Sequence, residues 1–160
     1  MPDRRRFLQA AACASLLAQP WAARALTTRQ PMLARPIWST GEMLPVVGLG
    51  TADTFNVSPS DAAAMAPLAQ VVDALLDGRG SLIDTAPSYG LAETVTGALL
   101  AREPDRRPQV FLATKISVQG HDAARRQIEQ SRRALRTDKL DLIQVHNLID
   151  TRNQLALLRD

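Results

Sequence analysis

Four residues of different chemical types could together transfer protons: Asp84, Tyr89, Lys115 and His146. Tyr89 is the only tyrosine in the sequence, and it follows Asp84 through a turn that contains Pro87. A phenol ordinarily keeps its proton until about pH 10, and a neighbouring ammonium stabilises the phenolate. We expect Asp84 to hold Lys115 charged and His146 to orient a carbonyl oxygen or relay a proton. Tyr89 would then donate its proton to an oxygen that gains negative charge as hydride arrives at its carbon.

The elements that must position these residues alternate between strand and helix. A short hairpin with a turn at Gly41 precedes a strand in residues 46–51, and a polar loop follows over residues 53–61. Apolar residues at three-to-four spacing predict a helix from Pro67 to a C-terminal cap at Gly78. Further strands are expected at residues 81–84, 110–115 and 140–146, and further helices between Gly90 and Pro104, at 121–136 and at 151–160. This order predicts parallel βαβ units with right-handed crossovers, in a barrel or an open doubly wound sheet.

The alternation of side chains along each strand tests whether the four residues meet. Helices require an apolar outer face of the sheet, which is formed by Ile83, Leu112, Ile143 and Val145. Asp84, Lys115 and His146 then point to the inner side, each at the C-terminal end of its strand. Ionisable groups at the same level of neighbouring parallel strands are typical of a catalytic site.

Each residue also has a structural interpretation. Asp84 could stabilise its turn, Lys115 could reach solvent from a strand end, and His146 could be a hydrogen-bonded core residue. Tyr89 could simply pack in its loop. The placement of all four at one end of the sheet favours a site over four separate structural roles.

Two other kinds of site are disfavoured by the sequence. The segment from Gly48 to Asp53 lacks the third glycine of a dinucleotide fingerprint and opens no helix, so a Rossmann site is not expected. A metal-dependent hydrolase that uses Asp84 and His146 is the weaker alternative, because the only other histidine, His121, lies away from the strand ends. We expect no bound metal.

The N-terminus predicts an export signal. Three arginines at positions 4–6 precede Phe7-Leu8 and an apolar, alanine-rich run, and Ala23-Arg24-Ala25 offers a small-x-small cleavage site. These features indicate a twin-arginine signal peptide in residues 1–25, and hence contact with that export machinery and a periplasmic or otherwise exported protein. Residues 26–35 are expected to be a flexible lead-in, and residues 36–160 to form the catalytic domain.

Removing the leader changes the charge balance. The whole chain carries a net charge of +3, and residues 1–25 hold four arginines against one aspartate. The remaining 15 basic and 15 acidic residues cancel, so the composition gives no support for nucleic-acid binding. Cys13, the only cysteine, also lies in the leader, and the mature part therefore has no disulfide. The apolar run of the leader is shorter than the roughly 20 residues that span a bilayer, and we expect no stable membrane span in the mature chain.

The motifs around the four residues resemble those of the aldo-keto reductases. They are Leu82–Gly90 with Ala92-Glu93, then Ala113-Thr114-Lys115, then Leu135–His146, preceded by Leu44–Thr51. The resemblance covers residues 37–160. It implies a (β/α)8 TIM barrel and a catalytic tetrad of Asp84, Tyr89, Lys115 and His146, with Tyr89 as general acid. It also implies that Thr51 and Asp84 approach the nicotinamide end of NADP, with NADPH favoured over NADH, and that the substrate is a small aldehyde or ketone.

Length limits what the resemblance implies. Complete barrels of this kind need about 250 residues, whereas the 135 residues after the leader suffice for the first four βα units. We therefore expect a chain that lacks the C-terminal half of the barrel and has little reductase activity by itself. The alternative function is a non-catalytic module that senses the cofactor or binds a partner on the same scaffold.

Overall fold

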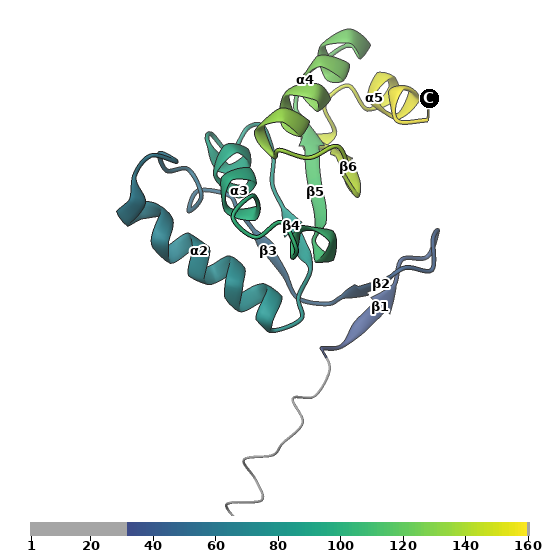
Figure 1. Cartoon of the computed structure of the whole chain (residues 1–160). Helices are drawn as coiled ribbons and strands as arrows, with labels where there is room; N and C mark the ends of the chain where they lie inside the picture. The colour runs from purple at the N-terminus through teal and green to yellow at the C-terminus, as the bar shows by residue number, and fades with distance from the viewer. Residues whose placement is uncertain (1–31, 160) are drawn as a thin grey trace, which may run out of the picture. The chain divides into compact units, whose positions relative to one another are not determined.

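A parallel four-stranded sheet forms the centre of the protein in the computed structural model, which describes residues 32–159 (Figure 1). The predicted signal peptide and most of the lead-in lie outside the described residues. The sheet consists of β3 (Gly48–Gly50), β4 (Leu82–Asp84), β5 (Phe111–Ile116) and β6 (Leu142–Val145) in sequence order. The pairing aligns Gly50 with Asp84 and Asp84 with Ala113, so strand ends meet at one edge. This arrangement confirms the expected parallel βα units and corresponds to part of a TIM barrel.

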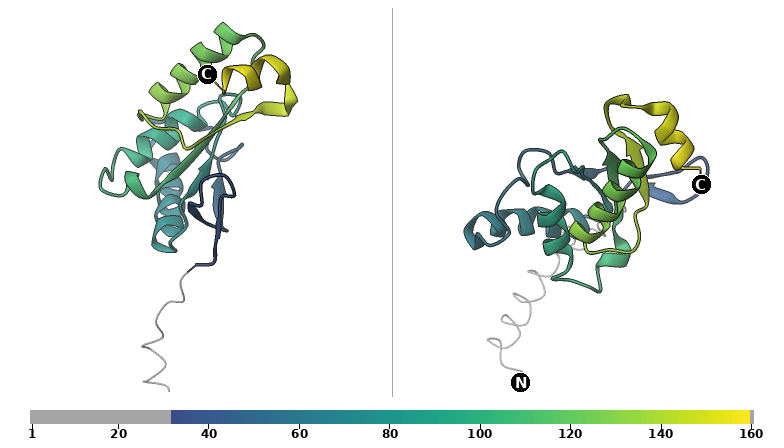
Figure 2. Two further views of the ribbon diagram at one scale, coloured as in Figure 1. Left: turned by 90° about the vertical axis from the view of Figure 1, so that its right-hand side faces the viewer. Right: turned by 90° about the horizontal axis from the view of Figure 1, so that it is seen from above.

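Helices cover one face of the sheet. They are α2 (Ala62–Asp77), α3 (Ala92–Leu100) and α4 (His121–Ala134), followed by the shorter α5 (Thr151–Leu157). Figure 2 shows α2, α3 and α4 side by side along the same face. Ile83 and Leu112 are completely buried beneath them, as the alternation along the strands predicts. None of the helices in residues 32–159 is long and apolar enough to cross a lipid bilayer.

The structure corrects several expected boundaries. Helix α2 begins at Ala62 rather than Pro67, because the Asp61 side chain caps it by accepting from the amides of Ala63 and Ala64 at 3.0 and 3.1 Å. Pro67 lies inside the helix. Ala63 and Pro67 are both exposed, so water can bind the Ala63 carbonyl that the missing N–H of Pro67 leaves unpaired.

The hairpin starts earlier than expected and β3 starts later. Strand β1 (Ala34–Pro36) pairs antiparallel with β2 (Met43–Pro45), so the end of the predicted lead-in is structured. The turn has Gly41 at φ +74°, a conformation that glycine adopts without strain. Val46 and Val47, which were expected in the first strand, lie before it and are about half exposed.

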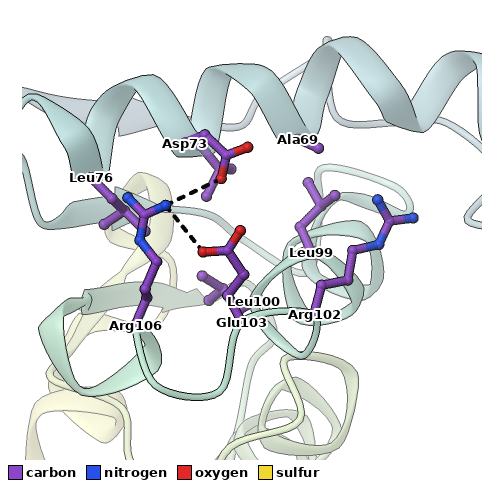
Figure 3. Close-up of a pocket in the computed structure, with 9 residues that line it drawn as sticks. Ala69, Asp73, Leu76, Leu99, Leu100, Arg102, Glu103 and Arg106 are labelled. Atoms are coloured by element: carbon purple, nitrogen blue, oxygen red, sulfur yellow. Dashed lines mark hydrogen bonds and ion pairs between the residues drawn. The ribbon is translucent and has the colours of Figure 1, made fainter.

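Close packing joins the helices outside the sheet. A Cβ atom on Gly97 of α3 would lie 2.2 Å from the carbonyl oxygen of Ala134 on α4, so only glycine allows this approach. Between α2 and the segment after α3, the Arg106 guanidinium bridges the carboxylates of Asp73 and Glu103 at 3.5 and 3.0 Å (Figure 3). It also pairs with Asp77 of α2 at 2.9 Å. These contacts tie α3 to α4, and α2 to the segment that follows α3.

Candidate active site

Asp84 and Lys115 form an ion pair across the C-terminal ends of β4 and β5. Lys115 lies two residues beyond Ala113, the residue aligned with Asp84, and therefore on the same face. Its Nζ donates to Asp84 Oδ2 at 2.6 Å and to the main-chain carbonyl of Thr85 at 2.8 Å. Only 11% of the lysine side chain is exposed. The ammonium is thus fixed by two acceptors, and one of its three N–H groups remains available.

Tyr89 lies in the loop between β4 and α3, and its ring contacts two of the other site residues. Lys115 Nζ lies 4.9 Å from the centre of the ring, within the range of a cation–π interaction. The imidazole of His146 meets the phenol ring edge to face, with 5.8 Å between ring centres and an interplanar angle of 89°. The structure therefore brings Asp84, Tyr89, Lys115 and His146 into one cluster. Their roles in catalysis stay a prediction.

The loop that carries Tyr89 is anchored at both ends. The Tyr89 amide donates to Ala86 O at 3.1 Å, closing the turn. At the other end, Leu91 N donates to Asn56 Oδ1 at 3.0 Å. Gly90 has φ +63°, and a Cβ there would lie 2.3 Å from the same Asn56 oxygen. Both conditions require glycine next to the tyrosine.

His146 lies just beyond the strand in which it was expected. Strand β6 ends at Val145, and His146 begins the short 3-10 helix η3 (His146–Leu148). Its Nδ1 is 3.1 Å from the hydroxyls of both Ser88 and Ser117. Among the described residues Nε2 has no hydrogen-bond partner, so it is the ring nitrogen that remains available for a further hydrogen bond. The hydrogen bond at Nδ1 sets which ring nitrogen carries the proton, and therefore whether Nε2 can donate or accept.

Sequence reasoning missed Ser88 and Ser117. Ser117 follows Lys115 by two residues, so the alternation along β5 places it on the inner face and could have identified it. Ser88 lies in the turn beside Tyr89, where no periodicity applies. Ser88 is therefore found only through its contact with His146.

Thr51 supports the carboxylate end of the site from the neighbouring strand. Its amide and its hydroxyl donate to the main-chain carbonyl of Asp84 at 3.0 and 3.1 Å, and the residue is completely buried. In this structure Thr51 thus acts on the site by holding Asp84, and the predicted contact of Thr51 with a cofactor stays a prediction.

A cleft of about 410 Å³ lies between the N-terminal hairpin and the inner face of the sheet, and of the four clustered residues only Asp84 lines it. Asp84 and Gln144 line it, together with apolar residues that include Leu82, Phe111 and Leu142. None of its lining residues is a lysine or an arginine. A Cβ on nearby Gly50 would meet nothing within 4 Å, which leaves room beside Asp84. With the carboxylates of Glu42, Asp84 and Asp141 in its lining and no cationic side chain, the cleft does not favour phosphate groups.

Comparison with known proteins identifies the family. Residues 46–158 match the model of the Aldo/keto reductase family. The chain is 35% identical, over an alignment of 104 residues, to the 6-dehydroglucose reductase of Novosphingobium aromaticivorans, covering 56% of this chain and 32% of that reductase. It thus spans about a third of the length of this curated relative.

Solved structures show the same relationship. A protein of Pseudomonas aeruginosa assigned to the aldo-keto reductases superimposes with a TM-score of 0.65 at 27% identity, over 84% of this chain and 60% of that one. An aldo/keto reductase from Klebsiella pneumoniae, solved with NADP and acetate, gives a TM-score of 0.61 at 27% identity, over 74% and 42% of the two chains. The matched segment contains all four clustered residues, and the chain belongs to the aldo/keto reductase family.

Proposed function

We propose that the protein is an NADP(H)-dependent oxidoreductase that reduces an aldehyde or a ketone to an alcohol. The observation that carries the proposal is the cluster in which the Lys115 ammonium, paired with Asp84 at 2.6 Å, lies over the ring of Tyr89. Family membership supports the reaction class, and the complex of the Klebsiella pneumoniae relative with NADP supports the choice of cofactor.

When bound, NADPH would supply the hydride that the carbonyl carbon accepts. Tyr89 donates its hydroxyl proton to the carbonyl oxygen as that oxygen becomes negative. The Lys115 ammonium stabilises the phenolate that remains, and Asp84 keeps the ammonium charged and in place. His146 orients the carbonyl oxygen through Nε2 while Ser88 and Ser117 hold Nδ1. In the reverse direction the phenolate accepts the proton of an alcohol.

The described residues account for the nicotinamide end of the cofactor site better than for its phosphate end. Asp84 and Gln144 offer a carboxylate and an amide beside the apolar floor of the cleft, and these suit a carboxamide. Because no lysine or arginine lines the cleft, we expect the 160-residue chain to bind NADPH weakly and to turn over slowly.

The predicted leader places this reaction outside the cytoplasm. In this proposal the twin-arginine machinery exports the protein folded, with its cofactor already bound, because free NADPH is not expected beyond the cytoplasm. Cell fractionation of the wild type and of an Arg5→Lys/Arg6→Lys variant tests the route. Retention of the variant in the cytoplasm supports it, and equal export of both proteins contradicts it.

The central experiment compares wild type with Tyr89→Phe, which keeps the ring and removes the proton donor. We expect NADPH oxidation with a simple aldehyde to fall by a factor of about 10² or more, the range of general acid catalysis. NADPH binding, measured by fluorescence titration, should be unchanged. Equal turnover by the two proteins would contradict the proposal. NADPH binding without turnover in the wild type would favour the cofactor-sensing alternative.

A further inference from the structure

Glu93 is a buried carboxyl group on the far side of the sheet from the four clustered residues. It is the second residue of α3 and only 7% exposed, and its Oε1 accepts a hydrogen bond from Thr114 Oγ1 at 2.6 Å. Thr114 is 1% exposed and directly precedes Lys115 in β5. One short hydrogen bond therefore joins the helix that follows Tyr89 to the strand that carries Lys115.

The main chain extends this connection to Tyr89 itself. The amide of Ala92, the first residue of α3, donates to the main-chain carbonyl of Tyr89 at 3.2 Å. Glu93 comes next in the chain. Any movement of α3 relative to β5 must therefore change the separation of the phenol and the ammonium, whose distance to the ring centre is 4.9 Å.

Burying a carboxyl group at this position costs free energy, because the charged form is removed from water. Burial raises the pKa of Glu93 above its ordinary value of 4.5, while the hydroxyls of Thr114 and Ser131 and the ammonium of Lys115 act in the opposite direction. Thr114 and Ser131 lie on the Glu93 side of the sheet, in β5 and α4, whereas Lys115 acts on Glu93 through space from the opposite face. An apolar side chain would fill the space without this electrostatic penalty, so packing alone does not account for a glutamate here.

We propose that Glu93 is a positioning residue, which fixes Tyr89 relative to Lys115 by clamping Thr114 to α3. The proposal rests on the reductase function proposed above, because the distance that it fixes is the one on which proton donation depends. Small misplacements of reacting groups lower turnover strongly.

The first test removes the Thr114 hydroxyl and compares the resulting variant with a matched control variant. Thr114→Val loses the donor to Glu93, whereas Thr96→Val removes an equally buried hydroxyl of α3 that has no hydrogen-bond partner among the described residues. We expect kcat of Thr114→Val to fall about tenfold or more with little change in KM for the carbonyl substrate, and Thr96→Val to match the wild type. Unchanged kcat in Thr114→Val would overturn the proposal.

Conservative variants keep the test valid if Thr114→Val folds poorly. Thr114→Ser retains the hydroxyl, and Glu93→Gln retains an oxygen that can accept from it, so both should keep wild-type kcat to within about threefold. Glu93→Leu removes the acceptor and should behave as Thr114→Val does. A fully active Glu93→Leu protein would contradict the clamp.

A spectroscopic readout separates failure of the clamp from failure of the proposed reaction. Tyr89 is the only tyrosine, so the ultraviolet absorbance of phenolate reports one residue and needs no turnover. We expect coinciding alkaline titration curves for wild type and Thr96→Val. The curve of Thr114→Val should be displaced to higher pH, because an ammonium that has moved stabilises the phenolate less. Three coinciding curves would refute the clamp even in a chain that shows no reductase activity.

Discussion

The ammonium of Lys115 binds the carboxylate of Asp84 at 2.6 Å and, at 2.8 Å, the carbonyl of the next residue along the chain. One side chain thus ties the end of β5 to the end of β4. The same ammonium lies 4.9 Å from the centre of the Tyr89 ring. Removing the ammonium should therefore break the link between the two strand ends and leave the phenol ring without its neighbouring positive charge.

The first prediction concerns this lysine. Lys115→Met keeps much of the side-chain length but removes the charge, so we expect kcat/KM to fall by about 10²-fold or more. Lys115→Arg keeps the charge but not the compact geometry of the ammonium, and its activity should lie between the two. Steady-state kinetics at one pH provides the comparison. A Lys115→Met protein with half of the wild-type activity would exclude a role for the ammonium.

The second prediction concerns the two serines at His146. Because either hydroxyl can hold Nδ1, Ser88→Ala and Ser117→Ala should each have a small effect. The double variant should lose about tenfold in kcat/KM, more than the single effects combined, because the two residues share one partner.

Ser60→Ala is the control for the serine variants, because Ser60 is exposed and its hydroxyl forms a hydrogen bond only with Ser58, at 2.9 Å, within the part of the chain that the structure describes. Additive effects in the double variant would show that the serines do not act through His146.

The third prediction concerns the pH dependence of stability. Burial raises the pKa of Glu93 above 4.5, so the folded state keeps this proton to higher pH than the unfolded state does. The resulting stabilisation is complete below pH 4.5 and is lost as pH rises through the raised value. Glu93→Gln does not titrate, so the wild type should lose stability relative to it across this window. Urea denaturation at a series of pH values measures the difference, and parallel curves for the two proteins would contradict it.

The fourth prediction concerns the contact between α3 and α4. Alanine is the better helix former by about 1 kcal/mol, yet a Cβ at Gly97 would lie 2.2 Å from Ala134 O. We expect Gly97→Ala to reduce the free energy of unfolding by about 2 kcal/mol, the usual scale for overpacking. Gly50→Ala, where a Cβ meets nothing within 4 Å, should change it by about 0.5 kcal/mol or less. Equal stability of wild type and Gly97→Ala would show that the helices can separate at little cost.

The alternation of side chains between the two faces of each strand was the sequence pattern that predicted the fold best. It requires Ile83 and Leu112 beneath the helices and Asp84 and Lys115 opposite, and the structure has this arrangement. The prediction succeeded because a strand with one face under helices has one allowed orientation. The contacts between side chains from different elements, such as Glu93 with Thr114, follow from no local pattern.

Element boundaries were predicted less well, for identifiable reasons. The first turns of α2 contain alanines, which have no apolar periodicity, so only the cap at Asp61 marks its start. Val46 and Val47 resemble strand residues, but β3 begins at Gly48, where a Cβ would lie 2.8 Å from the Leu82 side chain. His146 leaves the ladder because the chain turns into η3.

Strands β3 and β6 form the two borders of the sheet, and within residues 32–159 each is paired along one side only. Their outer sides present main-chain amides and carbonyls to any extended segment that approaches, and Leu142 at the start of β6 is 40% exposed. Molecules in a concentrated sample can therefore associate by pairing their edge strands. We expect the apparent molar mass from light scattering to rise with protein concentration at constant temperature, so a dilute stock should keep its activity longer than a concentrated one.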